Sequence, residues 1–313
     1  MTFDPSLAVG GFLVAIVVGL TGMGGGALMT PMLVFFFGTQ PLTAISSDIV
    51  ASLFMKPAGA LVHLRRGTIN VRLVGWLCVG SIPAAFSGAW LISLMPHGEQ
   101  LDWTLKHILG VALLVATSGL VARALFQMWR HKLPFGEGPA RAARPEVVVR
   151  PIPTLILGAL AGLLVGLTSV GAGSIVIVVL LMLYPGLKAS SLVGTDLAQA
   201  IPLVAAAALG HALFGSVSLT VTGSLLVGAL PGVWIGAQIS SRAPGGVVRR
   251  ALAVVLLASG LKLLDVPSEL VLGSAIATLV LGSLLWIALR RAARRSARGP
   301  AVDRRVRADP RVP

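Results

Sequence analysis

Two aspartates lie inside apolar runs, where an acid is costly unless it is paired, protonated or facing water. Asp48 lies in the run 42–64 and Asp196 in the run 189–213. A carboxyl in such a place can carry a coupled proton or build a binding site, and Gln199 lies on the same helical face as Asp196. The alternative is that both acids cap helices, because Ser, Thr and Asp are good caps.

Lys56 is a third charged group inside the run 42–64. It lies nine residues before Arg65, which is about 13 Å along a helix, and this depth is hard to reach by snorkelling alone. An ammonium group that faces a cavity would attract anions. The alternative is a structural ion pair with Asp48.

Two glycine-rich breaks interrupt the apolar runs, and each precedes a new apolar helix. Glycine lets the backbone turn sharply and approach a ligand, and the free N–H groups at the start of a helix favour an anion. We expect the breaks to share one substrate site, although close helix packing alone would also explain them. The candidate binding residues are Thr21, Gly22, Gly24, Gly25 and Gly26 in the first break and Thr168, Ser169, Gly171 and Gly173 in the second.

His63 and His211 lie near the ends of two apolar runs. A histidine there can act as a gate or accept a proton, or it can simply hydrogen-bond a backbone carbonyl. The topology predicted below places them on opposite faces of the membrane, so we expect no shared metal site. No cofactor is expected either.

The composition indicates where these residues are held. Of 313 residues, 56% are hydrophobic and 12% are charged, whereas a soluble domain carries about 25% charged residues. The sequence therefore predicts an all-α integral membrane protein. It excludes a soluble enzyme, a secreted disulfide scaffold and a disordered chain.

Most of the apolar runs are long enough for a helix that crosses a bilayer, which needs about 20 residues. The runs 7–20, 24–37 and 172–184 are shorter. A pair of neighbouring runs that contains a short run therefore forms either a re-entrant hairpin or two thin spans across the membrane. The other runs are 42–64, 70–95, 104–129, 152–168, 189–213, 217–241, 247–264 and 269–289.

The charged loops predict an orientation, because cytoplasmic loops carry an excess of Lys and Arg. One arrangement places every basic loop on the cytoplasmic side and the acidic turns 97–102 and 265–269 outside. The protein is then a multi-pass protein of the cell (inner) membrane, with its N-terminus outside and its C-terminus in the cytoplasm. The basic segments are 65–72, 130–150, 242–250 and 290–313.

The sequence also repeats internally. Val18 to Thr21 reappears as Val165 to Thr168, and at nearly the same spacing Asp48 matches Asp196. Other matched pairs are His63 with His211, Gly80 with Gly228, and Pro83 with Pro231. The first half starts outside and the second starts inside, so we expect two inverted-topology repeats with interrupted helices, which is typical of secondary transporters.

These features divide the chain into five segments. We expect a first transmembrane repeat over 1–129 and a second over 151–264, joined by a cytoplasmic linker at 130–150. One extra C-terminal span follows over 265–289, and a basic cytoplasmic tail completes the chain over 290–313.

The net charge of +14 does not indicate nucleic acid binding. No aromatic residues interleave with the arginines of the tail to stack bases. The expected partners are the lipid bilayer, with anionic lipids at the tail, and a small anionic substrate. The sequence leaves the oligomeric state open, a homo-oligomer included.

The glycine-rich segment 18–26 (VGLTGMGGG), followed by Asp48 and His63, resembles the sulfite exporter (TauE/SafE) family. The segment 166–173 (GLTSVGAG), followed by Asp196, strengthens the resemblance, which covers roughly 7–264. It implies an inner-membrane carrier of sulfite, organosulfonates or related small anions, often moved outward.

The sequence thus predicts a secondary transporter of a small anion, which the resemblance implies to be sulfite or an organosulfur oxyanion, coupled to protons through Asp48 and Asp196. Two other functions stay open. One is an anion channel without alternating access. The other is an intramembrane enzyme in which the two acids form an aspartyl dyad, although the glycine breaks would then have no role.

Overall fold

The computed structural model describes residues 3–282 except 22–24, 66–68, 97, 131–148, 172, 185–186, 188, 241–244 and 281. Within this part the chain is helical and contains no strand, which confirms the all-helical prediction. The labelled helices are α1 (Pro5–Thr21), α2 (Gly26–Phe36), α3 (Pro41–Arg65), α4 (Val71–Ser93), α5 (Glu99–Arg130), α6 (Pro151–Thr168), α7 (Gly173–Leu183), α8 (Ala189–Phe214), α9 (Leu219–Ser240) and α10 (Gly245–Leu263).

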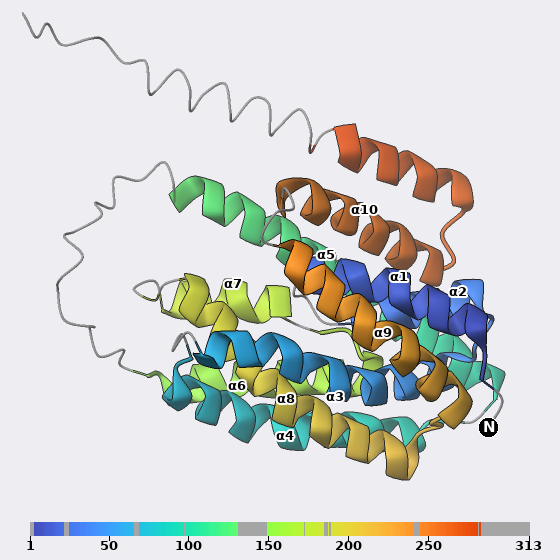
Figure 1. Ribbon diagram of the computed structural model, residues 1–313, viewed down its shortest axis with the longest axis horizontal. Helices are drawn as coiled ribbons and strands as arrows, with labels where there is room; N and C mark the ends of the chain where they lie inside the picture. The colour runs from blue at the N-terminus through green and yellow to red at the C-terminus, as the bar shows by residue number, and fades with distance from the viewer. Residues whose placement is uncertain are drawn as a thin grey trace, which may run out of the picture.

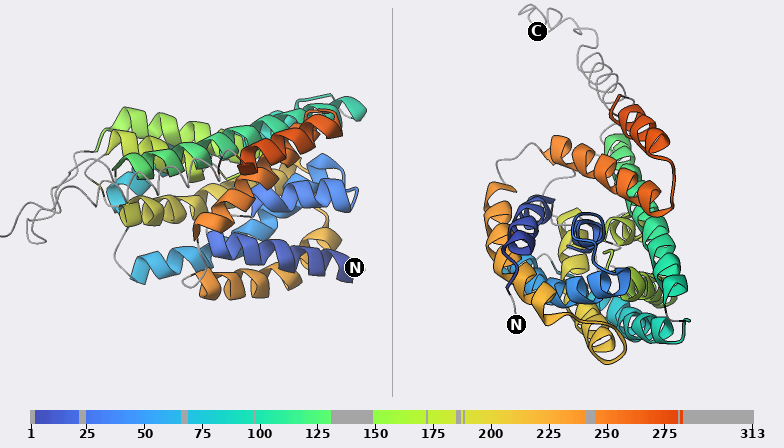
Figure 2. Two further views of the ribbon diagram at one scale, coloured as in Figure 1. Left: turned by 90° about the horizontal axis from the view of Figure 1, so that it is seen from above. Right: turned by 90° about the vertical axis from the view of Figure 1, so that its right-hand side faces the viewer.

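The helices lie side by side in one bundle (Figures 1 and 2). Many large hydrophobic side chains point outward, Phe36 at 83% and Val71 at 76% exposed among them, as expected where lipid replaces water. The helices that are long and apolar enough to cross a membrane are Val71–Ser93, Glu99–Ala122, Pro151–Thr168, Ser191–Phe214 and Leu219–Ile239.

Two pairs of helices double back on themselves. α2 and α7 have 11 residues each, which is about 16 Å of helix and half a membrane. A Cβ atom at Gly10, near the start of α1, would lie 3.1 Å from the Phe37 ring just after α2. Likewise the Tyr184 hydroxyl, just after α7, accepts the N–H of Arg150 at 2.9 Å at the start of α6. Each short helix therefore returns toward the start of its partner, and we call α1–α2 and α6–α7 the two hairpins.

Glycines let the hairpins pack closely on two long helices. Gly228 and Gly236 of α9 abut the backbone of α1, where a Cβ atom would overlap the carbonyl oxygens of Ala8 and Ile16. α6 packs on α4 in the same way, because a Cβ atom at Gly158 would overlap the carbonyl of Leu77. Small residues at a spacing of four are the usual means of close helix approach in membranes.

The two halves also make matching hydrogen bonds. The backbone N–H of Asn70, before α4, donates to Thr195 Oγ1 of α8 at 3.1 Å. The backbone N–H of Ser218, before α9, donates to Ser47 Oγ of α3 at 3.2 Å. α3 and α8 are therefore antiparallel neighbours, each fixed near its start to the connection that follows the other.

The hairpins begin at opposite ends of α3. Asp4 donates its backbone N–H to Ser224 Oγ at 3.0 Å, near the start of α9, and its carboxylate caps α1 by accepting from Ser6 N–H at 2.9 Å. The Ser6 hydroxyl, which donates to the same Asp4 oxygen at 2.6 Å, and the N–H groups of Leu7 and Ser6 hold the pKa of Asp4 below its usual value. The α6–α7 hairpin instead begins beside the start of α4, at the far end of α3.

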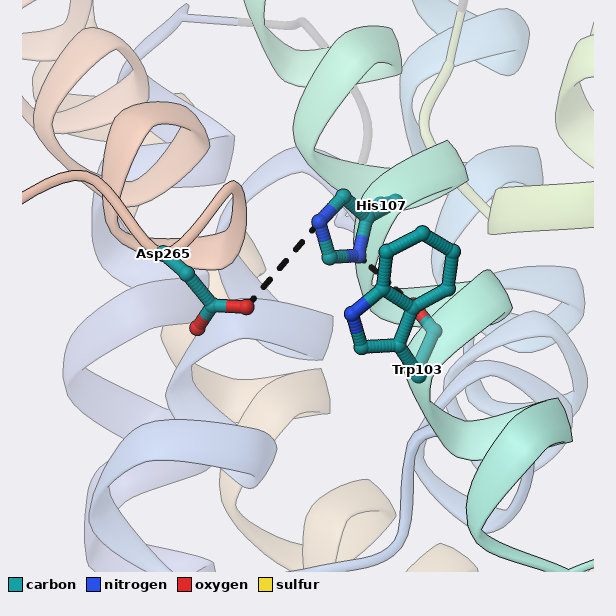
Figure 3. A network of polar contacts seen from close by, with 3 residues as sticks. All are labelled: Trp103, His107 and Asp265. Carbon is teal, nitrogen blue, oxygen red and sulfur yellow. Dashed lines mark hydrogen bonds and ion pairs between the residues drawn. The ribbon is translucent and has the colours of Figure 1, made fainter.

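One further apolar helix, Ser268–Val280, follows α10 and lies on the outside of the bundle (Figure 2). Asp265, at the turn before it, has a left-handed backbone (φ 57°). Its Oδ2 lies 3.9 Å from His107 Nε2 of α5, and the His107 ring packs on Trp103 (Figure 3). The described part of the predicted last span thus ends at residue 282, and the tail 290–313 lies outside the described residues, as does nearly all of the linker 130–150.

Candidate functional site at the hairpin tips

The tips of the two hairpins touch. Ser169 ends α6 with a left-handed backbone (φ 60°) and donates its N–H to the Val165 carbonyl at 2.8 Å. Its own carbonyl oxygen occupies the space that a Cβ atom of Gly26 would need at the start of α2. The two glycine-rich breaks, far apart in the sequence, therefore meet in direct backbone contact.

Asp48 lies beside this contact. Its side chain is fully buried in α3, and its Oδ2 accepts hydrogen bonds from Thr30 Oγ1 at 2.7 Å and from Ser169 Oγ at 2.8 Å. One carboxyl group therefore links α2, α3 and the end of α6. Two donors on one oxygen favour the ionised form locally, whereas burial opposes it.

The two acids occupy equivalent places. A Cβ atom at Gly25 would lie 3.4 Å from Asp48 Oδ1, and one at Gly173 would lie 2.8 Å from Asp196 Oδ2. Each carboxyl group thus faces the start of the short helix of its own half, α2 or α7, where the helix dipole is positive. Both acids lie well inside their own helices, so the alternative that they cap those helices is wrong.

Lys56 brings a positive charge to the same region. It is partly buried in α3, and both carboxylates attract it, Asp196 more strongly than Asp48. From the sequence, Asp48 was the alternative ion-pair partner of Lys56, whereas the larger attraction comes from Asp196 on α8. The three charged groups from the two halves therefore act on one another.

Gln199 lies one turn after Asp196 on α8. Its side chain is 2% exposed, and its Oε1 accepts a hydrogen bond from Ser81 Oγ of α4 at 3.2 Å. Asp196 itself is 8% exposed. Gln199 therefore ties α8 to α4 beside the acid.

The two threonines of the breaks bond to their own helices. Thr21 Oγ1 donates to the Val17 carbonyl at 2.9 Å. Thr168 Oγ1 donates to the Leu164 carbonyl at 2.6 Å and accepts the N–H of Val170 at 3.1 Å. These hydroxyl groups therefore hydrogen-bond the ends of their own helices in this conformation.

His211 is fully buried in α8 and bridges two helices. Its Nε2 lies 2.7 Å from the Gly166 carbonyl of α6, and its Nδ1 lies 2.8 Å from Ser46 Oγ of α3. Because a carbonyl can only accept, Nε2 carries the proton and Nδ1 accepts from Ser46. The side chain of its sequence counterpart His63 lies outside the described residues, as do Gly22 and Gly24.

Sequence reasoning missed two residues of this site. Thr30 is a polar residue inside the run 24–37, and Ser52 lies one helical turn after Asp48. Both are buried, and the position of Ser52 was a usable signal because residues four apart share a helix face. No group of three or more metal-ligating side chains occurs in the described part of the chain.

A comparison with known protein families identifies the family of this chain. Residues 7–263 match the family described as "Sulfite exporter TauE/SafE". The chain belongs to the TauE/SafE sulfite exporter family. It is therefore a multi-pass protein of a membrane transporter family, and the two hairpins with the touching tips lie within the matched region.

Relatives named as membrane transporters match along nearly their whole length. "Probable membrane transporter protein YjnA" of Bacillus subtilis (strain 168) is 36% identical over 263 residues, covering 83% of this chain and 99% of that protein. "Probable membrane transporter protein YdhB" of the same organism is 28% identical, covering 81% and 97%. No solved structure matches.

Proposed function

We propose that this TauE/SafE family member is a secondary carrier that exports a small anion, sulfite or a related organosulfur oxyanion, together with protons. The observation that carries the proposal is the backbone contact of Gly26 with Ser169, which joins the two breaks beside Asp48. The family description supports the substrate class.

The charges of the site explain why protons would accompany the anion. Two carboxylates and one ammonium give a net charge of about −1 when all are ionised. A bound anion would bring a second negative charge into a region of low dielectric, which is costly. Protonation of Asp48 or Asp196 removes this cost, so anion and proton are expected to bind together.

The matching contacts support an inverted repeat of 1–129 and 151–264. The two hairpins, starting from opposite ends of α3, are the expected product of such a repeat. Rocking of one half against the other would expose the tip region to each side in turn, as in other inverted-repeat carriers.

The orientation also belongs to this proposal, with the N-terminus outside and the C-terminus in the cytoplasm. It is tested with single cysteines in a Cys78→Ser background, placed by Glu99→Cys and by Arg72→Cys. An impermeant maleimide added to intact cells is expected to label position 99 and not position 72. The opposite pattern would invert the orientation.

The transport proposal is tested with purified protein in liposomes that contain a pH-sensitive dye. Sulfite, sulfate, thiosulfate, small sulfonates and lactate are offered in turn. Saturable movement of a sulfur oxyanion, with counterflow and a linked pH change, is the expected result. Flux of several anions without saturation or counterflow would instead identify a channel.

A further inference from the structure

The face of α3 that carries Asp48 continues toward the C-terminal end of the helix with two more polar residues. Ser52 lies one turn after Asp48, and Lys56 one turn after Ser52. Residues four apart lie above one another on a helix. Burial changes along this line: Asp48 is 0% exposed, Ser52 is 3% exposed, and Lys56 is partly exposed.

Two buried oxygens on this line, Asp48 Oδ1 and Ser52 Oγ, make no hydrogen bond of good geometry among the described residues, although Ser52 lies near enough to act on the Asp48 carboxyl group. Both face the same place, because a Cβ atom at Gly25 would lie 3.2 Å from Ser52 Oγ and 3.4 Å from Asp48 Oδ1. A buried polar atom without a partner is costly. A proton on Asp48 Oδ1 would give that oxygen a hydrogen to share with Ser52 Oγ and so relieve this cost.

The second half has no such line. At the spacing that matches Asp48 with Asp196, Ser52 corresponds to Ala200 and Lys56 to Val204. An alanine and a valine cannot pass a proton. The difference therefore gives Asp48, unlike Asp196, a hydroxyl group one turn further along its own helix on the way to Lys56.

We propose that Asp48, Ser52 and Lys56 form a proton relay that loads Asp48 Oδ1. This inference rests on the proton coupling proposed above and assigns it to one half. A rotamer change brings the Lys56 ammonium group to Ser52 Oγ, which has no partner in the described conformation, and Lys56 gives it a proton while Ser52 gives its own proton to Asp48 Oδ1. The neutral Lys56 amine then takes a proton from hydronium, which leaves water, so the sum is one proton added to Asp48.

Few other titratable side chains lie near Asp48 among the described residues. α2, α6 and α9 carry no titratable side chain, and α5 carries its charged residues toward its two ends. α8 contributes Asp196, which attracts Lys56, and His211, whose two ring nitrogens are already engaged. The relay and Asp196 are therefore the groups that a pH change is expected to reach.

Ser52→Ala removes the relay hydroxyl, and Ala200→Ser is the matched control in the other half. In transport, net anion movement driven by a pH gradient is expected to fall at least about ten-fold in Ser52→Ala, since positioned proton transfer usually contributes more than that. Anion counterflow at equal pH needs no net proton movement, so it is expected to fall much less than the gradient-driven rate in the same variant. Ser52→Thr, which keeps a hydroxyl, restores the gradient-driven rate, and Ala200→Ser changes neither rate.

Infrared difference spectra between low and high pH test the relay without any transport. The protonated carboxyl band that Asp48→Asn removes is expected to shift in Ser52→Ala and to stay unchanged in Ala200→Ser. A band and a gradient-driven rate in Ser52→Ala that both equal the wild type would overturn the relay. If no anion moves in the wild type, the proposed substrate fails, while the infrared band still decides the relay.

Discussion

The carbonyl oxygen of Ser169 fills the space beside Gly26 that any other residue would need for its Cβ atom. This single contact joins the end of α6 to the start of α2 and so fixes the two hairpin tips against each other. Ser169 reaches it from a left-handed backbone, which is unusual for a residue other than glycine. The hydrogen bond from its hydroxyl to Asp48 connects the tip contact to the buried acid.

Gly26→Ala is therefore expected to destabilise the protein. The obstructing atom belongs to the backbone, so relief requires a shift of α2 or α6, and overpacking of this kind costs about 1–3 kcal/mol. Thermal unfolding in detergent measures the effect. Gly75→Ala and Gly223→Ala are matched controls, because open space surrounds both glycines and alanine favours a helix by about 1 kcal/mol. Equal melting temperatures for all three variants would contradict the contact.

Lys56→Met is expected to weaken anion binding. Loss of a charge-assisted contact worth about 1.5–3 kcal/mol raises the KM for the transported anion by about ten-fold or more. Lys56→Arg keeps the charge and is expected to keep most of the affinity. Val204→Met is the control at the corresponding position of α8. A KM in Lys56→Met that matches this control would remove Lys56 from the substrate site.

Asp48→Asn is expected to abolish the pH dependence of flux and to leave the fold intact. The asparagine side-chain oxygen can still accept from Thr30 and Ser169, so the bonds that hold the tips survive, but the side chain no longer takes up a proton. Flux measured in liposomes across a range of pH tests this, with size-exclusion chromatography as the check on folding. A normal pH profile in the variant would exclude Asp48 as the proton carrier.

Much of this fold was predictable because apolar periodicity and charge placement survive in a single sequence. The helical class and the short length of the helices around the two breaks followed from run lengths, and the likeness of the halves followed from pairs such as Asp48 and Asp196. The choice between thin spans and re-entrant hairpins was not predictable, because both bring the chain back to the side where the first helix of the pair begins. Contacts such as Tyr184 with Arg150 show that the short helix doubles back along its partner, an arrangement that both alternatives share.

The partners of the site residues were less predictable than their identities. Asp48 bonds to Thr30 and Ser169, and which helices approach one another is set by the glycine contacts between α1 and α9 and between α4 and α6 rather than by local sequence. Thr168 was predicted as a ligand group, yet its hydroxyl donates to its own helix. A short hydroxyl side chain at a helix end has this local option, and sequence alone does not decide between the two.

The matching bonds of the two halves predict matching losses of stability. Ser47→Ala and Thr195→Val each remove the acceptor of one backbone N–H, from Ser218 and Asn70 respectively. Each is expected to cost about 0.5–1.5 kcal/mol, the net value of a typical hydrogen bond, because both bonds are only partly buried. Thermal unfolding of the two variants side by side measures the losses. A large loss in one variant and none in the other would show that the two halves do not use these bonds equivalently.

His211→Phe separates a structural role from a gating role. The ring joins α8 to α6 through the Gly166 carbonyl and to α3 through Ser46. Phenylalanine removes the donor to the Gly166 carbonyl, whereas Ser46 Oγ still accepts from the Ser216 N–H. The free energy of unfolding is therefore expected to fall by about 1–3 kcal/mol. The pH profile of flux in the folded fraction is expected to keep the wild-type shape, because His211 already has both ring nitrogens engaged and does not carry the coupled proton. Thermal unfolding together with flux against pH measures both effects. A variant with wild-type stability and an altered pH profile would make His211 a titrating gate instead.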